Sequence, residues 1–312
     1  MLTPGFADVR ACWVCRGAGL TRVHEALIDL EIYRDEDPPL AQYTGHHVWL
    51  VRCAACGFTQ PERLPLLPDF FNRLYAQRWA PDWIEREFDS TYKDLIFETV
   101  LDGLARRASR GGRLLDVGTH AGRFLRLAHE AGWQPEGVEL NARTAAFAEA
   151  RTGLTVHRAN IEQLTLAGRR YGVVTLIDVL EHIPEPVVLL TRIREALSPN
   201  GWVVVKVPSG PAQRLKESVR ARLRPGYRPR LADNLVHVNH FSPGSLRLAL
   251  ETAGFRDVSL EIGAPELPEA RGAAAVFSNL VRRSLYRSGR LIPMGVHTPL
   301  GLNLQAYARC PS

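Results

Sequence analysis

The sequence lacks long apolar runs. None of its hydrophobic stretches approaches the roughly 18–20 residues that a helix needs to span a bilayer. Residues 1–11 are mixed in composition and lack the basic-then-apolar pattern of an export signal. We therefore expect a cytoplasmic protein, and 312 residues are enough for about two domains with a substantial core.

Lysine is also scarce, because only Lys93, Lys206 and Lys216 occur and arginine supplies most of the positive charge. The formal net charge is +6 and the isoelectric point is about 9.3. A basic protein can bind nucleic acid or an anionic substrate. Because the charge is spread along the chain, we do not expect a nucleic-acid partner. The one dense basic stretch, residues 213–230, has Glu217 as its only acid.

Cysteine is rare too, but four of the five cysteines fall into two pairs, Cys12-Trp-Val-Cys15 and Cys53-Ala-Ala-Cys56. Each pair alone could be a redox motif, and a disulfide framework is not expected without an export signal. Two such pairs can place four thiolates tetrahedrally around one zinc ion. We therefore predict a structural zinc site in a zinc-ribbon-like region over residues 1–61. Strand-like segments at 27–33 and 47–52 and a polar loop at 35–39 lie between the pairs.

Residues 62–112 differ in composition from the cysteine-containing region before them. Pro61, Pro65 and Pro68 indicate a stiff linker. Apolar residues at three-and-four spacing then predict helices over about 70–79 and 84–107. We expect this segment to be a linker followed by cap helices.

A strand, a glycine turn and a helix follow at residues 113–131. Residues 113–117 are apolar like a buried strand, Gly118 and Gly122 form the turn, and residues 123–131 have helical spacing. Such a turn directs backbone N–H groups at a ligand above the strand end. Glu139 closes the next strand, where a carboxylate can bind both hydroxyls of a ribose. Together these features indicate a nucleoside-bearing cofactor, whereas the Gly-x-Gly-x-x-Gly loop of a dinucleotide enzyme is missing.

Strands and helices alternate from residue 113 onward, which predicts an α/β fold. The expected strands are residues 113–117, 135–139, 155–157, 171–177, 202–207, 258–262 and 302–309. The expected helices between them are residues 123–131, 142–151, 186–197 and one that begins at Ser242, its N-cap. We expect residues 113–312 to form this domain, with insertions at 208–240 and 266–298.

Two motifs carry a family resemblance. The loop Asp116-Val-Gly118-Thr-His120-Ala-Gly122 resembles the Asp-x-Gly-x-Gly-x-Gly loop of class I S-adenosylmethionine-dependent methyltransferases, with His120 in place of the middle glycine. The segment Asp178-Val-Leu-Glu-His182 is similar to that family's Asp-Val-Leu-Glu-His. The resemblance covers residues 90–312 and implies a seven-stranded Rossmann-like sheet with helices on both faces. With the cysteine pairs, it is closest to bacterial enzymes that modify sugars and natural products.

The resemblance also implies the residues that bind S-adenosylmethionine. The stretch Ala159-Asn160-Ile161-Glu162 resembles the family's Gly-Asp-x-Glu, with Asn160 in place of the acid that reads adenine. The residues expected to bind the cofactor are Asp116, Gly118, His120, Gly122, Glu139, Leu140, Asn160, Ile161 and Asp178.

The motifs also narrow the reaction. Asn/Asp-Pro-Pro-Tyr, typical of enzymes that methylate DNA bases, is absent. Sugar C-methyltransferases carry Tyr-x-Glu-His after the fifth strand, and here Asn234-Leu-Val-His237 keeps only the histidine. We therefore expect O-methylation of a small-molecule acceptor: a sugar, lipid-linked or natural-product hydroxyl. Sugar C-methylation is the alternative. A zinc-containing binding module with an inactive methyltransferase-like domain is the non-enzymatic alternative, and Asp116 and Glu139 argue against it.

Histidines are the expected catalytic groups, since an alcohol must lose a proton. His182 is predicted to be the base, and His237 a base or an acceptor-orienting group, while His240 lies nearby. Each could instead cap a helix or bind a backbone carbonyl.

Two further segments could contact the acceptor. Residues 213–230 are predicted to bind an anionic part of it, nucleotide- or lipid-linked, or to be a solvated lid. Residues 273–292 form an amphipathic helix that could lie on a membrane or pack against protein.

Overall fold

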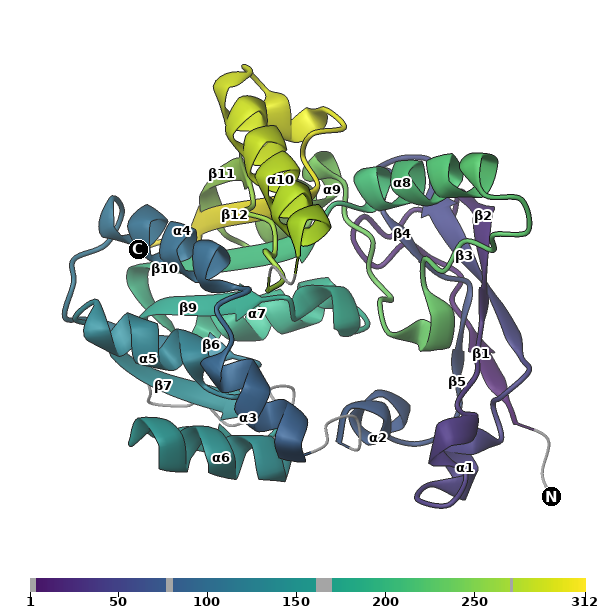
Figure 1. The fold of residues 1–312 in the computed structure, drawn as a ribbon, viewed down its shortest axis with the longest axis horizontal. Coiled ribbons are helices and arrows are strands. Elements are labelled where there is room, and N and C mark those ends of the chain that lie inside the picture. The colour runs from purple at the N-terminus through teal and green to yellow at the C-terminus, as the bar shows by residue number, and fades with distance from the viewer. Residues whose placement is uncertain (1–3, 77–80, 161–169, 270–271) are drawn as a thin grey trace.

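The computed structural model describes residues 4–76, 81–160, 170–269 and 272–312. Its centre is a seven-stranded sheet in the order β11-β12-β10-β9-β6-β7-β8 (Figure 1). β12 is antiparallel to both of its neighbours, and the other strand pairs are parallel. The strands are β6 (Arg113–Val117), β7 (Gln134–Glu139), β8 (Val156–Arg158), β9 (Tyr171–Ile177), β10 (Leu197–Pro208), β11 (Arg256–Ile262) and β12 (Asn303–Arg309). This confirms the predicted fold class.

Helices cover both faces of the sheet because successive side chains of each strand point to opposite sides. Leu114 and Val173 pack under α4 (Asp94–Ala105) and α5 (Arg123–Glu130). Their neighbours Leu115 and Val174 pack under α7 (Pro186–Ala196) and α9 (Pro243–Thr252). Helix α6 (Ala142–Thr152) packs beside β7 and β8. Ser242 caps α9 in a capping box, as expected.

The N-terminal unit contains two small sheets. One has β2 (Leu20–Leu27), β3 (His47–Cys53) and β4 (Thr59–Pro61), and the other pairs β1 (Phe6–Asp8) with β5 (Arg63–Pro65). The predicted strand at 27–33 was wrong. The strand ends at Leu27, and Leu30 and Tyr33 bury their side chains from a short 3-10 helix, η1 (Glu31–Tyr33).

The predicted loop at 35–39 contains the start of a helix instead. The Asp37 carboxylate accepts a hydrogen bond from the Leu40 N–H at 3.2 Å and caps α1 (Pro38–Ala41). Pro38, at the first helical position, has no N–H that would need a partner there.

The cap helices are α2 (Phe70–Ala76), α3 (Pro81–Asp89) and α4, so the single helix expected over 84–107 was wrong. Arg123 explains the interruption. Its guanidinium donates a hydrogen bond to the Phe88 carbonyl at 2.8 Å and forms an ion pair with Asp94 at 2.5 Å. The end of α3 and the start of α4 are therefore both tied to α5.

The N-terminal unit packs onto the α/β domain through the segment that follows β10. The Phe58 and Phe241 rings lie 5.0 Å apart, and the Thr59 and His240 backbones exchange hydrogen bonds of 3.0 and 3.3 Å. The Asn234 side chain, in η3 (Asp233–Leu235), accepts a hydrogen bond from the Asp29 N–H at 2.6 Å. The two parts therefore share one hydrophobic core.

Two helices project from the α/β domain: α8 (Gly210–Leu223) and α10 (Ala273–Leu291) (Figure 1). Each belongs to one of the expected insertions. Two further 3-10 helices are η2 (Leu180–His182) and η4 (Gly295–His297). Among the described helices, none combines the length and the hydropathy that are needed to cross a bilayer.

Candidate functional site

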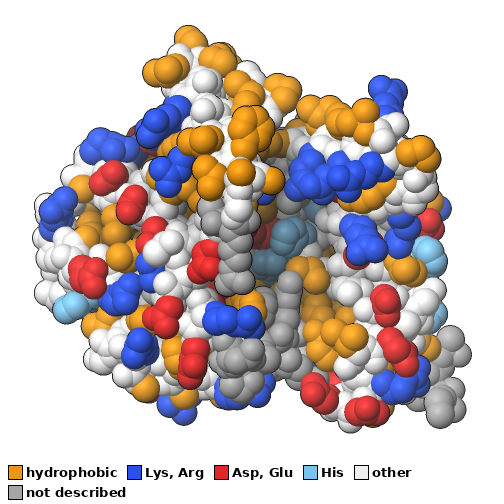
Figure 2. All heavy atoms as spheres, viewed as in Figure 1, with side chains coloured by type: hydrophobic (Ala, Val, Ile, Leu, Met, Phe, Trp, Pro, Cys, Tyr) orange, Lys and Arg blue, Asp and Glu red, His pale blue; other side chains and the backbone are white. Residues whose placement is uncertain are grey.

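A cavity of about 990 Å³ lies at the carboxyl ends of β6, β7, β9 and β10. Side chains of α2, α8 and the segment after β10 complete its walls. Ligands of open α/β sheets bind at this edge. All three lysines of the chain, Lys93, Lys206 and Lys216, line the cavity. Figure 2 shows the molecule hollowed between α10 and α8.

The turn between β6 and α5 requires glycine at two positions. Gly118 has φ +73°, and a Cβ there would lie 2.5 Å from the Val179 side chain. Gly122 has φ +88°, and a Cβ there would lie 3.0 Å from that of Ala148. His120, which replaces a glycine of the family motif, also has a positive φ of 53°. Its ring lies edge-on to Trp83 of α3, with the ring centroids 4.9 Å apart.

Glu139 is fixed against the glycine turn. Its two carboxylate oxygens accept hydrogen bonds from the N–H groups of His120 and Asn141, both at 2.9 Å. Burial raises the pKa of Glu139, and N–H groups of Asn141, His120 and Leu140 oppose that shift. Glu139 and Leu140 therefore line the cavity in a fixed geometry.

The other residues expected to bind the cofactor fall into three groups. Gly118, His120, Asn160 and Asp178 line the large cavity. Asp116, which lies before the turn at the end of β6, and Gly122, which is part of the turn, do not line this cavity. Ile161 lies outside the described residues.

Asp116 is a buried residue under the turn. It accepts a hydrogen bond from the Thr175 hydroxyl at 2.6 Å, and burial raises its pKa to about 7. Its position indicates that it supports the turn from below.

Asp178 lies between two lysines, and sequence reasoning missed both. Lys206 Nζ donates to one carboxylate oxygen at 2.5 Å, and Lys93 Nζ lies 3.5 Å from the other. Burial alone would raise the pKa of Asp178, but Lys206 and Lys93 lower it to about 2. The scarcity of lysine was the signal that could have pointed to this cluster.

His182 and His237 meet at the rim of the cavity, with ring centroids 4.8 Å apart. His182 Nδ1 lies 2.6 Å from the Val236 carbonyl oxygen, which can only accept a hydrogen bond. The Tyr75 hydroxyl donates to the same carbonyl at 2.7 Å and lies 2.9 Å from Nδ1. The proton of a neutral His182 is therefore directed to Nδ1, which leaves Nε2 as the basic nitrogen.

His240 lies apart from this pair. It is buried against the N-terminal unit, and burial followed by the charge of Arg214 lowers its pKa to about 3. His240 does not line the cavity.

Glu181 is a third residue whose place in the site sequence reasoning missed. It lines the cavity, and burial followed by the charge of Asp178 raises its pKa to about 8. Its ligand atoms and those of His182 and His237 lie within 4.8 Å of one another. The raised pKa lowers the negative charge that Glu181 places beside the histidines.

Cations from two helices gather at the outer part of the cavity: Lys216 and Arg220 of α8, and Arg282 of α10. Burial lowers the pKa of Lys216, and the charges of Arg220 and Arg282 lower it further. Arg220 forms an ion pair with Glu217 at 3.1 Å, and Arg282 donates to the Glu266 backbone carbonyl. Two arginines and a lysine thus line one side of the cavity.

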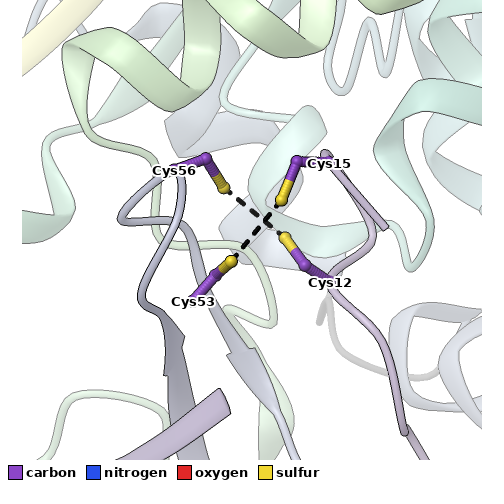
Figure 3. A group of neighbouring side chains, drawn as sticks. All are labelled: Cys12, Cys15, Cys53 and Cys56. Carbon is purple, nitrogen blue, oxygen red and sulfur yellow. Dashed lines mark hydrogen bonds between the residues drawn. The ribbon is translucent and has the colours of Figure 1, made fainter. Parts of the chain in front are cut away.

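The four paired cysteines form a separate centre in the N-terminal unit. Their sulfur atoms point at a common point (Figure 3), with 3.5 Å between Cys12 and Cys56 and between Cys15 and Cys53. Four sulfurs around zinc at about 2.3 Å would lie about 3.8 Å apart, so this donor set fits zinc closely. A residue with positive φ directly follows each cysteine pair: Arg16 after Cys15 and Gly57, with φ +71°, after Cys56.

A family described as "Methyltransferase domain" matches residues 88–260, which is more than half of the chain. The chain belongs to the class I S-adenosylmethionine-dependent methyltransferases. This confirms the predicted family and its methyl donor.

Curated relatives agree with the family. The chain is 29% identical to a ubiquinone biosynthesis O-methyltransferase of Nitrosospira multiformis over 43% of its own length and 56% of the relative's. It is 34% identical to the enzyme of that name from Cereibacter sphaeroides, over 43% and 60% of the two lengths. The matches thus span somewhat more than half of these relatives.

A solved structure with the same fold is a chain from a complex between the Haloferax volcanii Trm112 methyltransferase activator and a methyltransferase. The TM-score is 0.53 at 19% identity, over 74% of this chain and 97% of that one.

Proposed function

We propose that this methyltransferase transfers the methyl group of S-adenosylmethionine to a hydroxyl oxygen of a small-molecule acceptor, with His182 as the base. The observation that carries the proposal is the His182 ring, which is fixed by the Val236 carbonyl and lines the same cavity as the glycine turn and Glu139. When bound, S-adenosylmethionine supplies a sulfonium methyl group whose leaving group is a neutral thioether.

The residues around the glycine turn fit this cofactor. Gly118 has no room for a side chain, so its backbone can approach a ligand closely. Each oxygen of Glu139 accepts one backbone N–H and keeps a further lone pair for a ribose hydroxyl. Asn160 follows β8 on the same edge of the sheet, where its amide can bind adenine. Lys93 and Lys206 place positive charge in the cavity that can face the cofactor's carboxylate.

The acceptor hydroxyl must give up its proton as the new C–O bond forms. We infer that His182 Nε2 takes this proton, because the Val236 carbonyl holds the other proton at Nδ1. Tyr75 is then a positioning residue, since its hydroxyl donates to that carbonyl and lies beside the ring. His237, whose ring lies beside that of His182, orients the acceptor.

Three observations favour an anionic acceptor and oxygen chemistry. Lys216, Arg220 and Arg282 line the cavity, and their charges lie close enough to interact. The named relatives are O-methyltransferases. Asn234 belongs to the segment that corresponds to the C-methyltransferase motif. Its side chain accepts a hydrogen bond from the Asp29 N–H and does not line the cavity. A sugar, lipid-linked or natural-product hydroxyl that carries phosphate or carboxylate fits this set.

The zinc that we propose at the four cysteines is structural, since four thiolates leave no open position for chemistry. Its unit holds the segment after β10 through Phe58, Thr59 and Asp29. That segment carries Val236 and His237, so the zinc unit builds the acceptor side of the cavity.

Calorimetry with S-adenosylhomocysteine and with S-adenosylmethionine tests the proposal. We expect binding by the wild type and at least a tenfold weaker affinity for Glu139→Gln, because an amide cannot accept at both positions. Glu149→Gln, on the exposed face of α6, is the matched control and should bind normally. Wild type that binds neither compound would contradict the proposal and support a non-enzymatic role. Radiolabelled methyl transfer to a panel of hydroxylated acceptors then tests the chemistry.

A further inference from the structure

Exposed apolar side chains are concentrated on two helices. Large hydrophobic residues exposed on α8 are Leu215, Val219 and Leu223, and those on α10 are Val276, Phe277, Leu280, Val281 and Leu285. Leu291, the last residue of α10, belongs to the second group as well, and Ile292 and Met294 extend it past the end of the helix. Most of the large hydrophobic residues that are exposed in the described part of the chain lie on these elements. We call α8 and α10 the rim helices.

The rim helices are weakly packed on the rest of the protein. Of the 19 residues of α10, only Tyr286 and Gly289 are buried, and both are near its C-terminal end. In α8, only Gly210 and Ala212 are buried, at its N-terminal end. The exposed apolar residues recur at three-and-four spacing, so each helix presents a continuous stripe that its own fold does not cover.

The charges on the rim helices are almost all positive. Helix α10 carries Arg282, Arg283, Arg287 and Arg290 and no acid. Helix α8 carries one acid, Glu217, which accepts hydrogen bonds from Tyr227 and from the Arg230 backbone and pairs with Arg220. In Figure 2 the orange and blue side chains of the two helices lie on either side of the hollow.

We propose that the rim helices dock this protein onto an anionic lipid membrane. An apolar stripe flanked by arginine is the pattern of helices that lie in the membrane interface, where the stripe enters the acyl boundary and the cations meet lipid phosphates. A second copy of this chain fits the surface less well, because a two-fold contact would bring together two copies of the same arginine-rich patch, which repel each other.

Docking on the rim helices presents the cavity to the membrane, since both helices line it. The acceptor is then a lipid-linked molecule with an anionic head group, and Lys216, Arg220 and Arg282 lie where that group enters. This part of the inference rests on the proposed function.

Flotation of the full-length protein with vesicles tests the docking. We expect binding to phosphatidylcholine vesicles that contain phosphatidylglycerol, weaker binding in high salt, and little binding to phosphatidylcholine alone. Phe277→Glu with Leu280→Glu, and separately Leu215→Glu with Val219→Glu, should each lower the partition coefficient by roughly tenfold or more, since glutamate loses the apolar contact and is repelled by the lipid. Val23→Glu with Ile32→Glu, at exposed apolar sites in the N-terminal unit, is the matched control and should bind like wild type.

Several results would overturn the inference. They are failure to float with the anionic vesicles, equal flotation of wild type and the rim variants, and a dimer that the rim variants dissociate without any vesicle binding. Calorimetry with S-adenosylhomocysteine on the same preparations separates the two proposals. A protein that binds this compound but not vesicles loses only the docking, and one that binds vesicles but not this compound loses only the proposed function.

Discussion

Single contacts determine what His182 can do. Its Nδ1 lies 2.6 Å from the Val236 carbonyl oxygen, which only accepts hydrogen bonds. This contact places the proton of the neutral ring on Nδ1 and makes Nε2 the basic nitrogen. Glu181, which precedes it in the chain, is buried, and its raised pKa lowers the negative charge beside the ring. A histidine in this state can accept a proton from an alcohol and release it to water through the open cavity.

We predict that His182→Ala keeps its affinity for S-adenosylhomocysteine and loses about 10²–10⁴-fold in turnover, the usual contribution of a placed base. The acidic limb of the pH–rate profile should disappear with it. Steady-state kinetics and calorimetry check both parts, and His129→Ala, an exposed histidine on α5, is the control. Wild-type turnover in this variant would mean that positioning alone carries the reaction.

Tyr75→Phe separates positioning from chemistry. It should lower turnover less than His182→Ala, because the His182 ring keeps Nε2 and loses only the Tyr75 hydroxyl beside Nδ1. It should also shift the acidic limb of the pH–rate profile. A variant that changes only thermal stability would assign Tyr75 a structural role.

The sequence predicted elements better than it predicted their junctions. Most strands and helices from residue 113 onward lie close to the expected ranges, because buried strands are short apolar runs and the helices have an apolar period of about 3.6 residues. The exceptions are β10, which begins at Leu197 instead of residue 202, and α8, which was not predicted as a helix. The break between α3 and α4 was missed because the contacts that hold it come from Arg123, which lies far along the chain. The lysine pair at Asp178 and the Tyr75–Val236–His182 contact were missed for the same reason, as each joins segments that are distant in sequence.

The N-terminal unit should matter to the acceptor side of the site more than to the cofactor side. We expect one zinc ion per chain and, for Cys12→Ser, loss of the zinc with lower thermal stability. Acceptor turnover should fall more than affinity for S-adenosylhomocysteine, because η3 and the segment with His237 rest on this unit. Metal analysis, thermal melts and calorimetry measure these effects.

Cys310→Ser is the matched control, since Cys310 is buried but far from the cluster in sequence and outside it. It should keep its zinc and its activity. Substoichiometric zinc in wild type, together with a Cys12→Ser variant as stable as wild type, would contradict a structural metal.

Salt should affect the acceptor through the rim of the cavity. Contacts from Lys216, Arg220 and Arg282 to an anionic acceptor are partly exposed and are screened by ions. We expect the KM for the acceptor to rise with ionic strength, and Arg282→Gln to flatten that dependence. Arg287→Gln, on the same helix but not lining the cavity, is the control. An acceptor KM that does not respond to salt would argue against an anionic acceptor.

Across the whole molecule, two buried groups make stability depend on pH in opposite directions. Burial raises the pKa of Asp116 to about 7, whereas it lowers the pKa of His240 to about 3. Between about pH 4 and pH 7, native Asp116 keeps a proton that the unfolded chain has lost, so the free energy of unfolding falls as the pH rises. His240 acts in the other direction, because up to about pH 6.5 the unfolded chain binds a proton that the native histidine does not.

Asp116→Asn isolates the first effect. Asparagine keeps the shape of the side chain and an oxygen that can accept from the Thr175 hydroxyl, but it has no proton to lose. We therefore expect the stability of wild type to fall relative to Asp116→Asn as the pH rises from about 4 to 7, by up to about 1.4 kcal/mol per pH unit. Urea unfolding of both proteins across this range measures the difference, and the contribution of His240 cancels in it. Parallel curves would show that Asp116 is already ionised in the native protein, and the turn above it would then rest on a buried carboxylate rather than on a neutral acid.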